Sequence, residues 1–450
     1  MNNKQSRRNF IKNAGLAGAA ITFPTIIPAS ALSTHAPSNQ INIGLIATGR
    51  QAIKVNLKQF LSMDNVRVIA VNDPDHWRMQ QAADIINNHY SIDNQTYKGV
   101  QSYNDYRELL QNKDIDAVMI SSPDHWHVPQ GIAAAQAGKH IAMEKALSIC
   151  INHSKALVES IVENNVHHRL DSEFRSKENF STAVGLLRAG AIGKINKVIV
   201  GVPSPLNGSA PDPQPTMPVP EELDYDQWLG PAYTAPYTMR RVHEPKTYDV
   251  RPGWMRIDDY CNGMITNWGA HLIDIALWGI DKEYESPVSV EGDGRFTQSL
   301  WNTIESFNLT YQFADGMSLE YIIDEPYVKF EGEDGWIKAA FKKPLEASDP
   351  SILQHDIAPQ FKNVVSDKQD FINSIIQNKE SLEPMQVGHN VYRLCNMGLL
   401  SIKLGRKLNW NSAKDKFEND NAANTMLYRP FRKKYIDKSV VDWLEKYQLI

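Results

Sequence analysis

The segment from Ala117 to Leu147 (AVMISSPDHWHVPQGIAAAQAGKHIAMEKAL) constrains the fold more than any other part of the chain. Apolar runs at 117–121 and 140–143 predict two short strands. Between them, Pro129 suits the first turn of a helix and Gly138 suits its end. The segment therefore predicts a strand, a helix and a second strand.

Two short polar sequences follow these strands, SPDHWH at 122–127 and Glu144-Lys145. Because such a crossover joins parallel strands, both sequences emerge at the carboxyl edge of one sheet. Open α/β sheets bind their ligands at that edge, so we expect the functional site there. His125 and His127 could converge on a metal, but no third ligand has a recognisable spacing, and we expect no metal site.

Length and composition indicate a two-domain globular protein. At 450 residues the chain is too long for a single hydrophobic core. Its net charge of −5 gives no indication of nucleic-acid binding. The three cysteines, Cys150, Cys261 and Cys395, are widely spaced, which favours buried thiols over a disulfide framework or a zinc site.

Residues 1–31 have the pattern of a twin-arginine signal peptide. SRRNFIK at Ser6–Lys12 precedes an apolar stretch at 14–27, and Ala29-Ser30-Ala31 suits cleavage. The alternative is a basic amphipathic membrane anchor. We expect a periplasmic mature protein without a membrane-inserted segment, because no later run is long and apolar enough to span a bilayer.

The turn after the first strand, 41–46, is placed where a dinucleotide site would lie. Matched to G-x-G-x-x-G, its positions are Ala47, Gly49 and Ala52, so only the glycine that lets pyrophosphate approach the backbone is retained. The Cβ of Ala47 crowds a tight turn. From this turn we expect four residues at the cofactor: Ala47, Thr48, Gly49 and Arg50.

Asp73 follows the next strand, 66–71, at the distance expected for a carboxylate that accepts from a ribose 2′-hydroxyl. A 2′-phosphate there would be repelled, which favours NAD over NADP. Asp73 also suits a helix N-cap, and the two roles are compatible. Together with the crossover, this predicts a Rossmann domain with a doubly wound parallel sheet at residues 38–172.

Residues 173–410 predict a second domain of the α+β class. Its later strands follow one another without intervening helices, which indicates an open, largely antiparallel sheet. Residues 203–222 are rich in proline and predict an extended arm or a loop over the surface. The predicted strands are 194–203, 286–292, 303–313, 317–323, 328–332 and 335–340; helices are expected at 368–377 and 388–404, and an irregular polar tail at 411–450.

Four segments together resemble the Gfo/Idh/MocA oxidoreductases, the family of glucose-fructose oxidoreductase and inositol dehydrogenase. They are INIGLIATGR, SSPDHWH, AGKHIAMEKAL and GMITNWGAHLIDIALWG. Leu229-Gly230-Pro231 and Pro252-Gly253-Trp254 resemble its secreted branch, which acts on sugars and glycosides. The resemblance implies NAD(P) across the first domain, a small-molecule sugar or glycoside between the domains, and a homo-oligomer formed through the open sheet.

The resemblance also assigns residues at the sheet edge. It places Ser122, Pro123 and His127 beside the nicotinamide ribose, and Glu144 and Lys145 beside nicotinamide and substrate. The family's third residue after Glu-Lys is proline, whereas this chain has Ala146, which constrains the backbone at Lys145 less. The alternative for Glu144-Lys145 is a solvated strand end, which the position of the pair at the carboxyl edge of the sheet disfavours.

Residues 268–280 (WGAHLIDIALWGI) are apolar on most faces and predict a buried helix. His271 and Asp274 share one face, which would place an imidazole beside a carboxylate; the alternative is a satisfied core pair. Family members often have a catalytic aspartate where this chain has Asn267, and an amide cannot accept a proton. We therefore expect the catalytic acid or base to be Lys145 or His271. We expect the substrate beside Trp254, Asn267, His271 and Asp274, with Trp254 and Trp268 stacking on a sugar ring.

These observations predict an NAD-dependent enzyme that oxidises a CH–OH group of a sugar or glycoside, at C3, with a tightly bound cofactor. Lys145 or His271 would take the hydroxyl proton. One alternative is an NAD-dependent glycosidase, in which transient oxidation at C3 allows elimination of the C1 substituent. A further alternative is a non-catalytic carbohydrate-binding protein. It is suggested by three departures from the expected motifs, at Ala47, Ala146 and Asn267.

Overall fold

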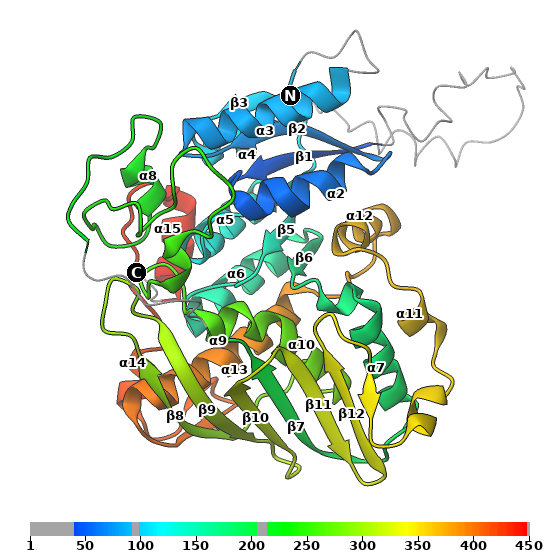
Figure 1. Ribbon diagram of the computed structural model, residues 1–450. Coiled ribbons are helices and arrows are strands. Elements are labelled where there is room, and N and C mark those ends of the chain that lie inside the picture. Colours follow the sequence, from blue (N-terminus) through cyan, green and yellow to red (C-terminus); the bar gives the residue numbers. More distant parts are fainter. Residues whose placement is uncertain (1–39, 92–98, 205–213, 448–450) are drawn as a thin grey trace, which may run out of the picture. The chain divides into compact units, whose positions relative to one another are not determined.

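The computed structural model describes residues 40–91, 99–204 and 214–447. Ile41–Ile450 form one compact unit, and the predicted signal peptide lies outside the described residues. Within those ranges, no helix combines the length and apolar character needed to cross a bilayer. Figure 1 shows the arrangement of helices and strands, which is α/β as predicted.

The N-terminal domain contains six parallel strands in the order β3-β2-β1-β4-β5-β6. Two hydrophobic clusters lie on its opposite faces, one including residues of α5 and α6 and the other including residues of α2 and α3. The predicted doubly wound parallel sheet is therefore confirmed. Its strands are β1 (Ile41–Ile46), β2 (Val66–Asn72), β3 (Gln101–Tyr103), β4 (Ala117–Ile120), β5 (His140–Glu144) and β6 (His168–Asp171); its helices are η2 (Ala52–Asn56), α2 (Leu57–Leu61), α3 (His76–Ser91), α4 (Tyr106–Gln111), α5 (Asp124–Gln136) and α6 (Ile151–Asn164).

The crossover from β4 to β5 explains the apolar sequence between them. Every residue of β4 is buried, as expected for a central parallel strand. A Cβ added at Gly131 would lie 2.6 Å from Leu157 and 2.7 Å from Met143, so α5 packs too closely for a side chain there. The strand order reverses between β1 and β4, and this leaves a crevice at their carboxyl ends.

The start predicted for the crossover helix was wrong. The helix α5 begins at Asp124, with Pro123 as its N-cap, so Pro129 lies inside it and the predicted SPDHWH loop forms its first turn. A proline there leaves only one carbonyl, that of His125, without a helical donor. The burial of the surrounding residues of α5 against the sheet and α6 stabilises the longer helix.

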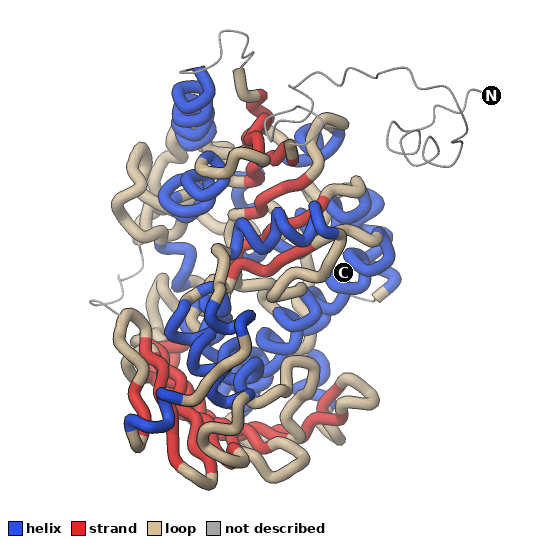
Figure 2. The backbone as a smooth tube through the Cα atoms, turned by 90° about the vertical axis from the view of Figure 1, so that its right-hand side faces the viewer, coloured by secondary structure: helices blue, strands red, loops and turns tan. Residues whose placement is uncertain are grey.

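The second domain is built on nine strands in the order β13-β12-β11-β7-β10-β9-β8-β14-β15. Among the strands that the structure describes, only β7 and β10 pair in parallel in this sheet, which confirms that it is largely antiparallel. The two sheets occupy separate layers, as Figure 2 shows. The strands are β7 (Ile195–Val202), β8 (Ser289–Phe296), β9 (Ile304–Gln312), β10 (Ser318–Ile323), β11 (Tyr327–Gly332), β12 (Gly335–Ala340), β13 (Glu346–Ala347), β14 (Leu408–Asn411) and β15 (Lys416–Phe417).

Three helices of the second domain cover one face of this sheet. Side chains of α7, α10 and α13 form one hydrophobic core with the strands. The opposite face carries ion pairs, including one between Lys197 and Glu320 at 2.8 Å and one between Lys329 and Glu331 at 2.6 Å. The helices are α7 (Glu178–Arg188), α8 (Tyr225–Leu229), α9 (Met264–Asn267), α10 (Gly269–Gly279), α11 (Pro359–Lys362), α12 (Asp367–Gln377) and α13 (Met385–Leu404); short 3₁₀ turns are η3 (Phe174–Ser176), η4 (Gly253–Arg256) and η5 (Pro350–Gln354).

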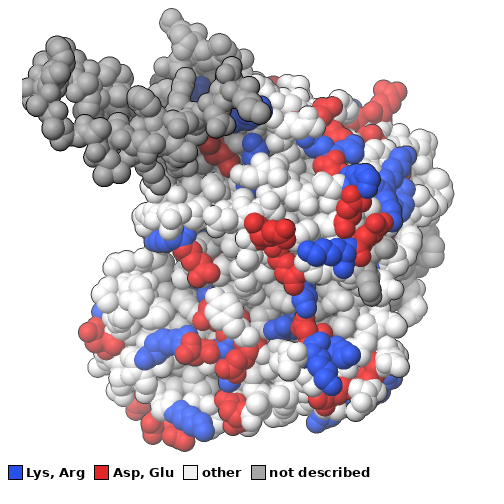
Figure 3. Space-filling view, turned by 180° about the vertical axis from the view of Figure 1, so that it is seen from behind, with Lys and Arg blue, Asp and Glu red and all other residues white. Residues whose placement is uncertain are grey.

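The C-terminal segment is irregular only in part, so the prediction of an irregular tail was partly wrong: residues 426–437 form no helix or strand, but the rest includes regular elements. It contains β14, which pairs with β8, then β15, α14 (Asn421–Thr425) and α15 (Lys438–Lys446). Val440 and Leu444, four residues apart, are fully buried in the cluster that also contains residues of α5 and α6. The chain therefore returns to the first domain. Figure 3 shows basic and acidic side chains interspersed over the described part of one face of the molecule.

We expect Leu444→Ala to lower the free energy of unfolding by about 2–5 kcal/mol, because it leaves a cavity beneath α15. Denaturant titration followed by fluorescence measures this change. Asp442→Ala, on the exposed side of the same helix, is the control and should alter stability by less than about 1 kcal/mol. Equal stabilities of the two variants would show that α15 does not support the first domain.

Candidate active site

One cavity of about 430 Å³ lies at the carboxyl edge of the first sheet, between that sheet and residues of the second domain. Its walls combine residues that are far apart in the sequence. The first domain contributes Ala47, Gly49, Arg50, Asp73, Ser122, Pro123, Glu144 and Lys145, and the second contributes Glu173, Trp254, Asn267, Trp268 and His271.

The turn after β1 has the backbone of a dinucleotide turn. Ala47 occupies the first glycine position with φ of +67°, a left-handed conformation that costs a residue with a Cβ roughly 1–2 kcal/mol. A Cβ built at Gly49 would meet no atom within 4 Å, so the backbone there faces open space. These features fit the approach of a pyrophosphate to the turn, at the start of the helix that continues into η2 and α2.

Asp73, at the end of β2, is held by backbone and side-chain donors. Thr48 donates to its Oδ2 from N at 2.7 Å and from Oγ1 at 3.1 Å, and the Asp75 backbone N–H donates to Oδ1 at 2.8 Å. Burial raises the pKa of Asp73 to about 6, and the nearby charge of Asp75 adds to this rise. Asp73 lines the cavity, whereas Thr48 is fully buried behind it and orients the carboxylate.

The turn after β4 places two of its three predicted residues on the cavity wall. Ser122 and Pro123 line the cavity, and the Ser122 hydroxyl donates to Gln130 Oε1 at 2.7 Å. His127 is fully buried behind the wall instead of beside it. Its Nδ1 lies 2.5 Å from the carbonyl oxygen of Ala146, and its Nε2 lies 2.8 Å from that of Ser122. His127 thus holds the two turns together.

Glu144 and Lys145 end β5 at the floor of the cavity. Glu144 is 5% exposed, its Oε1 accepts from Asn56 Nδ2 at 3.0 Å, and burial raises the pKa of its carboxyl. Lys145 is more accessible, and among the described residues its ammonium has no ion-pair partner. Lys145 is therefore available to a bound ligand. The peptide bond from Lys145 to Ala146 is cis.

His271 projects from α10 into the other side of the cavity. Its Nδ1 contacts the carbonyl oxygen of Ser172, and its ring stacks on Phe174 at 4.5 Å between centroids. Burial lowers the pKa of His271 to about 3, with the charge of Lys145 contributing. Because a carbonyl only accepts, the neutral ring carries its proton on Nδ1, and Nε2 remains an acceptor.

The structure does not bring Asp274 into the cavity. Its carboxylate is fully buried and forms an ion pair with Arg175, with Nη2 to Oδ1 at 2.6 Å. His271 and Asp274 lie three residues apart on α10, yet His271 is oriented by Ser172. The predicted pairing of imidazole and carboxylate on one helix face was therefore wrong: Asp274 has a guanidinium partner that no local sequence pattern indicates.

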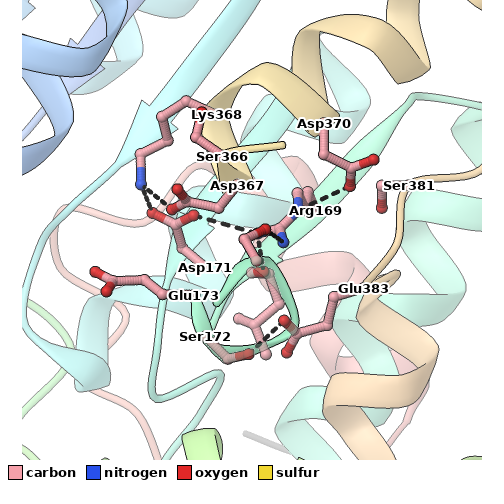
Figure 4. Close-up of polar contacts among 12 residues, drawn as sticks. Arg169, Asp171, Ser172, Glu173, Ser366, Asp367, Lys368, Asp370, Ser381 and Glu383 are labelled. Atoms are coloured by element: carbon pink, nitrogen blue, oxygen red, sulfur yellow. Dashed lines mark hydrogen bonds and ion pairs between the residues drawn. The ribbon is translucent and has the colours of Figure 1, made fainter. Parts of the chain in front are cut away.

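A group of buried charges lies behind the ends of β5 and β6, as Figure 4 shows. Lys368 of α12 donates to Asp171 and, at 2.6 Å, to Asp367. Asp171 is the strand neighbour of Glu144, so this group lies directly beside the cavity floor. Arg169 donates to Asp370 at 2.9 Å. Buried charges require such partners, and these pairs join α12 to the first sheet.

Residues 243–251, which we call the strap, cross the dinucleotide turn. Tyr248 donates from its hydroxyl to the carbonyl oxygens of Thr48 at 3.2 Å and Arg78 at 3.3 Å. Arg78 donates to the carbonyl oxygens of Glu244 at 3.2 Å and Thr247 at 3.0 Å. At the ends of the strap, His243 contacts Asp75 and Asp249 pairs with Lys54. The sequence of the strap has no periodicity that would predict it, and an extended arm or surface loop was expected only earlier, at the proline-rich residues 203–222.

A Rossmann domain whose turn opens on a cavity with Lys145 and His271 defines an NAD-binding oxidoreductase. Residues 41–171 match the family model described as an oxidoreductase family, NAD-binding Rossmann fold, and residues 207–437 match that of an oxidoreductase family, C-terminal alpha/beta domain. The chain belongs to the Gfo/Idh/MocA family of oxidoreductases, as its sequence motifs indicated.

The relatives include proteins named for two activities. A glycosyl hydrolase family 109 protein of Shewanella baltica (strain OS185) is 27% identical over 205 residues, 42% of this chain and 44% of that protein. A levoglucosan dehydrogenase of Pseudarthrobacter phenanthrenivorans is 36% identical over 94 residues, 21% of this chain and 24% of that protein. These matches span less than half the length of the curated relatives.

Solved structures share the fold. The crystal structure of the WlbA dehydrogenase from Bordetella pertussis in complex with NADH and UDP-GlcNAcA has a TM-score of 0.61 at 16% identity. The alignment covers 83% of this chain and 99% of that chain. At this identity the match establishes the shared fold, including a Rossmann domain followed by the second sheet.

We expect NAD affinity to fall as the pH drops from 7.5 to 5, because Asp73, with its pKa raised to about 6, then loses the charge that accepts from the ribose hydroxyls. Asp73→Ala should weaken NAD binding at pH 7.5 and narrow the gap between NAD and NADP. Calorimetric titration measures both. Thr48→Val, which keeps the carboxylate, should retain the preference for NAD, and a wild-type preference for NADP would contradict this placement of Asp73.

Proposed function

We propose that this protein oxidises a CH–OH group of a sugar or glycoside, at C3, with a tightly held NAD. One observation carries the proposal: Lys145 and His271, from different domains, face the cavity that also contains Asp73 and the open backbone at Gly49. When bound, NAD accepts a hydride. Gly49, Arg50 and Asp73 would hold its pyrophosphate and ribose, and Ser122, Pro123 and Glu144 would face the nicotinamide end.

The remaining residues define what happens to the sugar. The neutral His271 accepts a hydrogen bond from the reacting hydroxyl at Nε2, because its Nδ1 is committed to Ser172. The Lys145 ammonium polarises the same oxygen. An ammonium cannot accept a proton, so His271 accepts the hydroxyl proton at Nε2 when Lys145 is charged, and a neutral Lys145 amine is the alternative acceptor. Trp254 and Trp268 supply flat apolar surfaces for the ring, and Asn267 offers an amide to a second hydroxyl.

Lys145→Met and His271→Ala should each depress turnover by about 100-fold or more while changing NAD affinity little, as expected for groups that act on the reacting hydroxyl. Steady-state rates with a panel of glycosides, together with NAD titration, measure the two effects. Lys58→Met, on the exposed side of α2, is the control. Near-normal turnover of both cavity variants would contradict the proposed roles.

A second candidate function is net glycoside cleavage. It is favoured by the relatives named glycosyl hydrolase family 109 proteins. Oxidation at C3 makes the C2 proton acidic, elimination then releases the C1 substituent, and the returned hydride restores the sugar. A keto sugar as product indicates the dehydrogenase, whereas free sugar without net NADH indicates cleavage.

We further propose that the protein is exported in folded form with NAD inside it. Two features support this proposal. The SRRNFIK sequence indicates the twin-arginine route, which carries folded proteins. The strap crosses the dinucleotide turn, where its Tyr248 donates to Thr48 and its Glu244 accepts from Arg78. A cofactor that cannot exchange must be reoxidised in place. Either a second carbonyl substrate or the returning sugar hydride closes the cycle.

The exported form, purified without added nucleotide, should begin near Leu32 by intact mass and should contain NAD by absorbance. Tyr248→Phe should release NAD roughly fivefold faster, the effect of losing about one hydrogen bond. Tyr233→Phe, at a ring that is 58% exposed, is the control. An uncleaved exported chain, or an empty protein that works only with excess soluble NAD, would contradict these proposals.

A further inference from the structure

Glu173 is held in an unfavourable backbone conformation at the wall of the cavity. Its φ is +65°, in the left-handed region that glycine adopts far more readily than glutamate. The residue lies between β6 and η3, and its side chain lines the cavity. Non-glycine residues in this region persist where the surrounding structure imposes them, and they concentrate at functional sites.

The left-handed backbone at Glu173 affects the positions of three groups. The carbonyl of the preceding Ser172 orients His271, and the ring of the following Phe174 stacks on the same imidazole. The side chain between them reaches the cavity, where its Oε1 accepts from Gln51 Nε2 at 3.4 Å. In Figure 4, Glu173 extends away from the Lys368 group, and no contact joins them. The carboxylate therefore lines the same cavity as the imidazole of His271.

Its accessibility distinguishes Glu173 from the other carboxylates nearby. Its side chain is 24% exposed, and its nearest cation is Lys177, at 3.6 Å. Glu144 is buried and bonded to Asn56, and Asp171 is paired with Lys368. Of these three carboxylates, Glu173 alone combines exposure to the cavity with a long contact to a cation, so it can exchange a proton with a substrate.

We propose that Glu173 is a catalytic base that removes the proton from the sugar carbon adjacent to the oxidised one. The inference rests on the proposed function, because that proton becomes acidic only next to a ketone. It assigns separate groups to the two protons: His271 and Lys145 act on the hydroxyl, and Glu173 acts on the carbon.

The step balances with the groups present. The C2–H bond breaks, its proton goes to a Glu173 oxygen, and its electron pair forms a C2–C3 double bond as the C3 ketone becomes an enolate. The enolate then re-forms the ketone, and the electron pair moves into a C1–C2 double bond as the C1–O bond breaks. The leaving group departs with the electron pair of the C1–O bond and takes a proton from water, which leaves hydroxide. Addition of this hydroxide at C1 and return of the proton from Glu173 to C2 reverse the electron flow, so Glu173 ends as the carboxylate.

Two measurements on the NAD-loaded protein test the proposal. Glycosides are incubated in heavy water, nicotinamide absorbance reports hydride transfer, and NMR reports deuterium at C2 of the recovered sugar. Glu173→Gln should reduce nicotinamide at a rate close to that of wild type, whereas deuterium uptake at C2 should fall by about 100-fold or more. Glu173→Asp, which keeps a carboxylate, should restore part of the exchange.

A third measurement, the melting temperature, does not depend on activity. Glu173→Gly relieves the left-handed strain, so it should melt at or above the wild-type temperature while losing exchange at C2. Asn165→Gly, at an exposed left-handed helix end, is the matched control and should keep both activities. A lower melting temperature of Glu173→Gly would indicate a structural role and would contradict the proposal.

The outcomes separate this inference from the function on which it rests. Wild-type exchange at C2 in Glu173→Gln, or hydride transfer without any exchange in wild type, overturns the role of Glu173 and leaves the oxidoreductase intact. Equal loss of hydride transfer and exchange in Glu173→Gln shows that Glu173 acts on the hydroxyl proton instead of the carbon proton. That result also overturns the proposed role of Glu173. A wild-type protein whose nicotinamide no glycoside reduces overturns the proposed function and this inference together.

Discussion

The imidazole of His127 holds together the two turns on which the site depends. It lies fully buried between the carbonyl oxygens of Ser122 and Ala146, one in the turn after β4 and the other in the turn after β5. Burial lowers its pKa to about 4, so the ring is neutral and donates to one of the two carbonyls. Ser122 and Lys145 consequently keep a fixed separation, and the cavity between them is preformed.

The second domain completes this edge through buried charge. Lys368 comes from α12, near the end of the chain, yet it lies between Asp171 and Asp367 behind Glu144. Removing one member would leave an uncompensated buried charge, which costs far more than a surface ion pair contributes. The position of α12 and the electrostatic environment of Glu144 are therefore coupled, although Asp171 and Lys368 lie 197 positions apart in the sequence.

Local patterns predicted the elements and much of the cavity wall. The run at 117–121, the turn at Gly49 and the apolar helix around His271 each carry periodicity or composition that secondary structure requires. Asp274 and His127 were misplaced because their partners, Arg175 and the carbonyl of Ala146, are chosen by tertiary packing. The same limit explains why α15 was missed, since its two buried side chains are few among many charged residues.

The strap and Glu173 could not be predicted for a different reason. Neither is part of a repeating pattern: the strap is fixed by single contacts such as that of Tyr248 with Thr48, and Glu173 by one backbone torsion. Features of this kind become visible only when the second domain is placed against the first.

Of the non-glycine residues that line the cavity, Ala47 and Glu173 have left-handed backbones. A glycine would relieve the strain at either position, but the consequences differ. At Ala47 the methyl group contributes nothing to ligand chemistry, and the turn tolerates it because its N–H still donates to Asn72 at 2.9 Å. At Glu173 a glycine would delete the carboxylate itself. The two positions are also connected, because Gln51, which contacts Glu173, lies in the helical turn that directly follows the Ala47 turn. The geometry of the cofactor turn therefore helps to orient the Glu173 side chain toward the cavity.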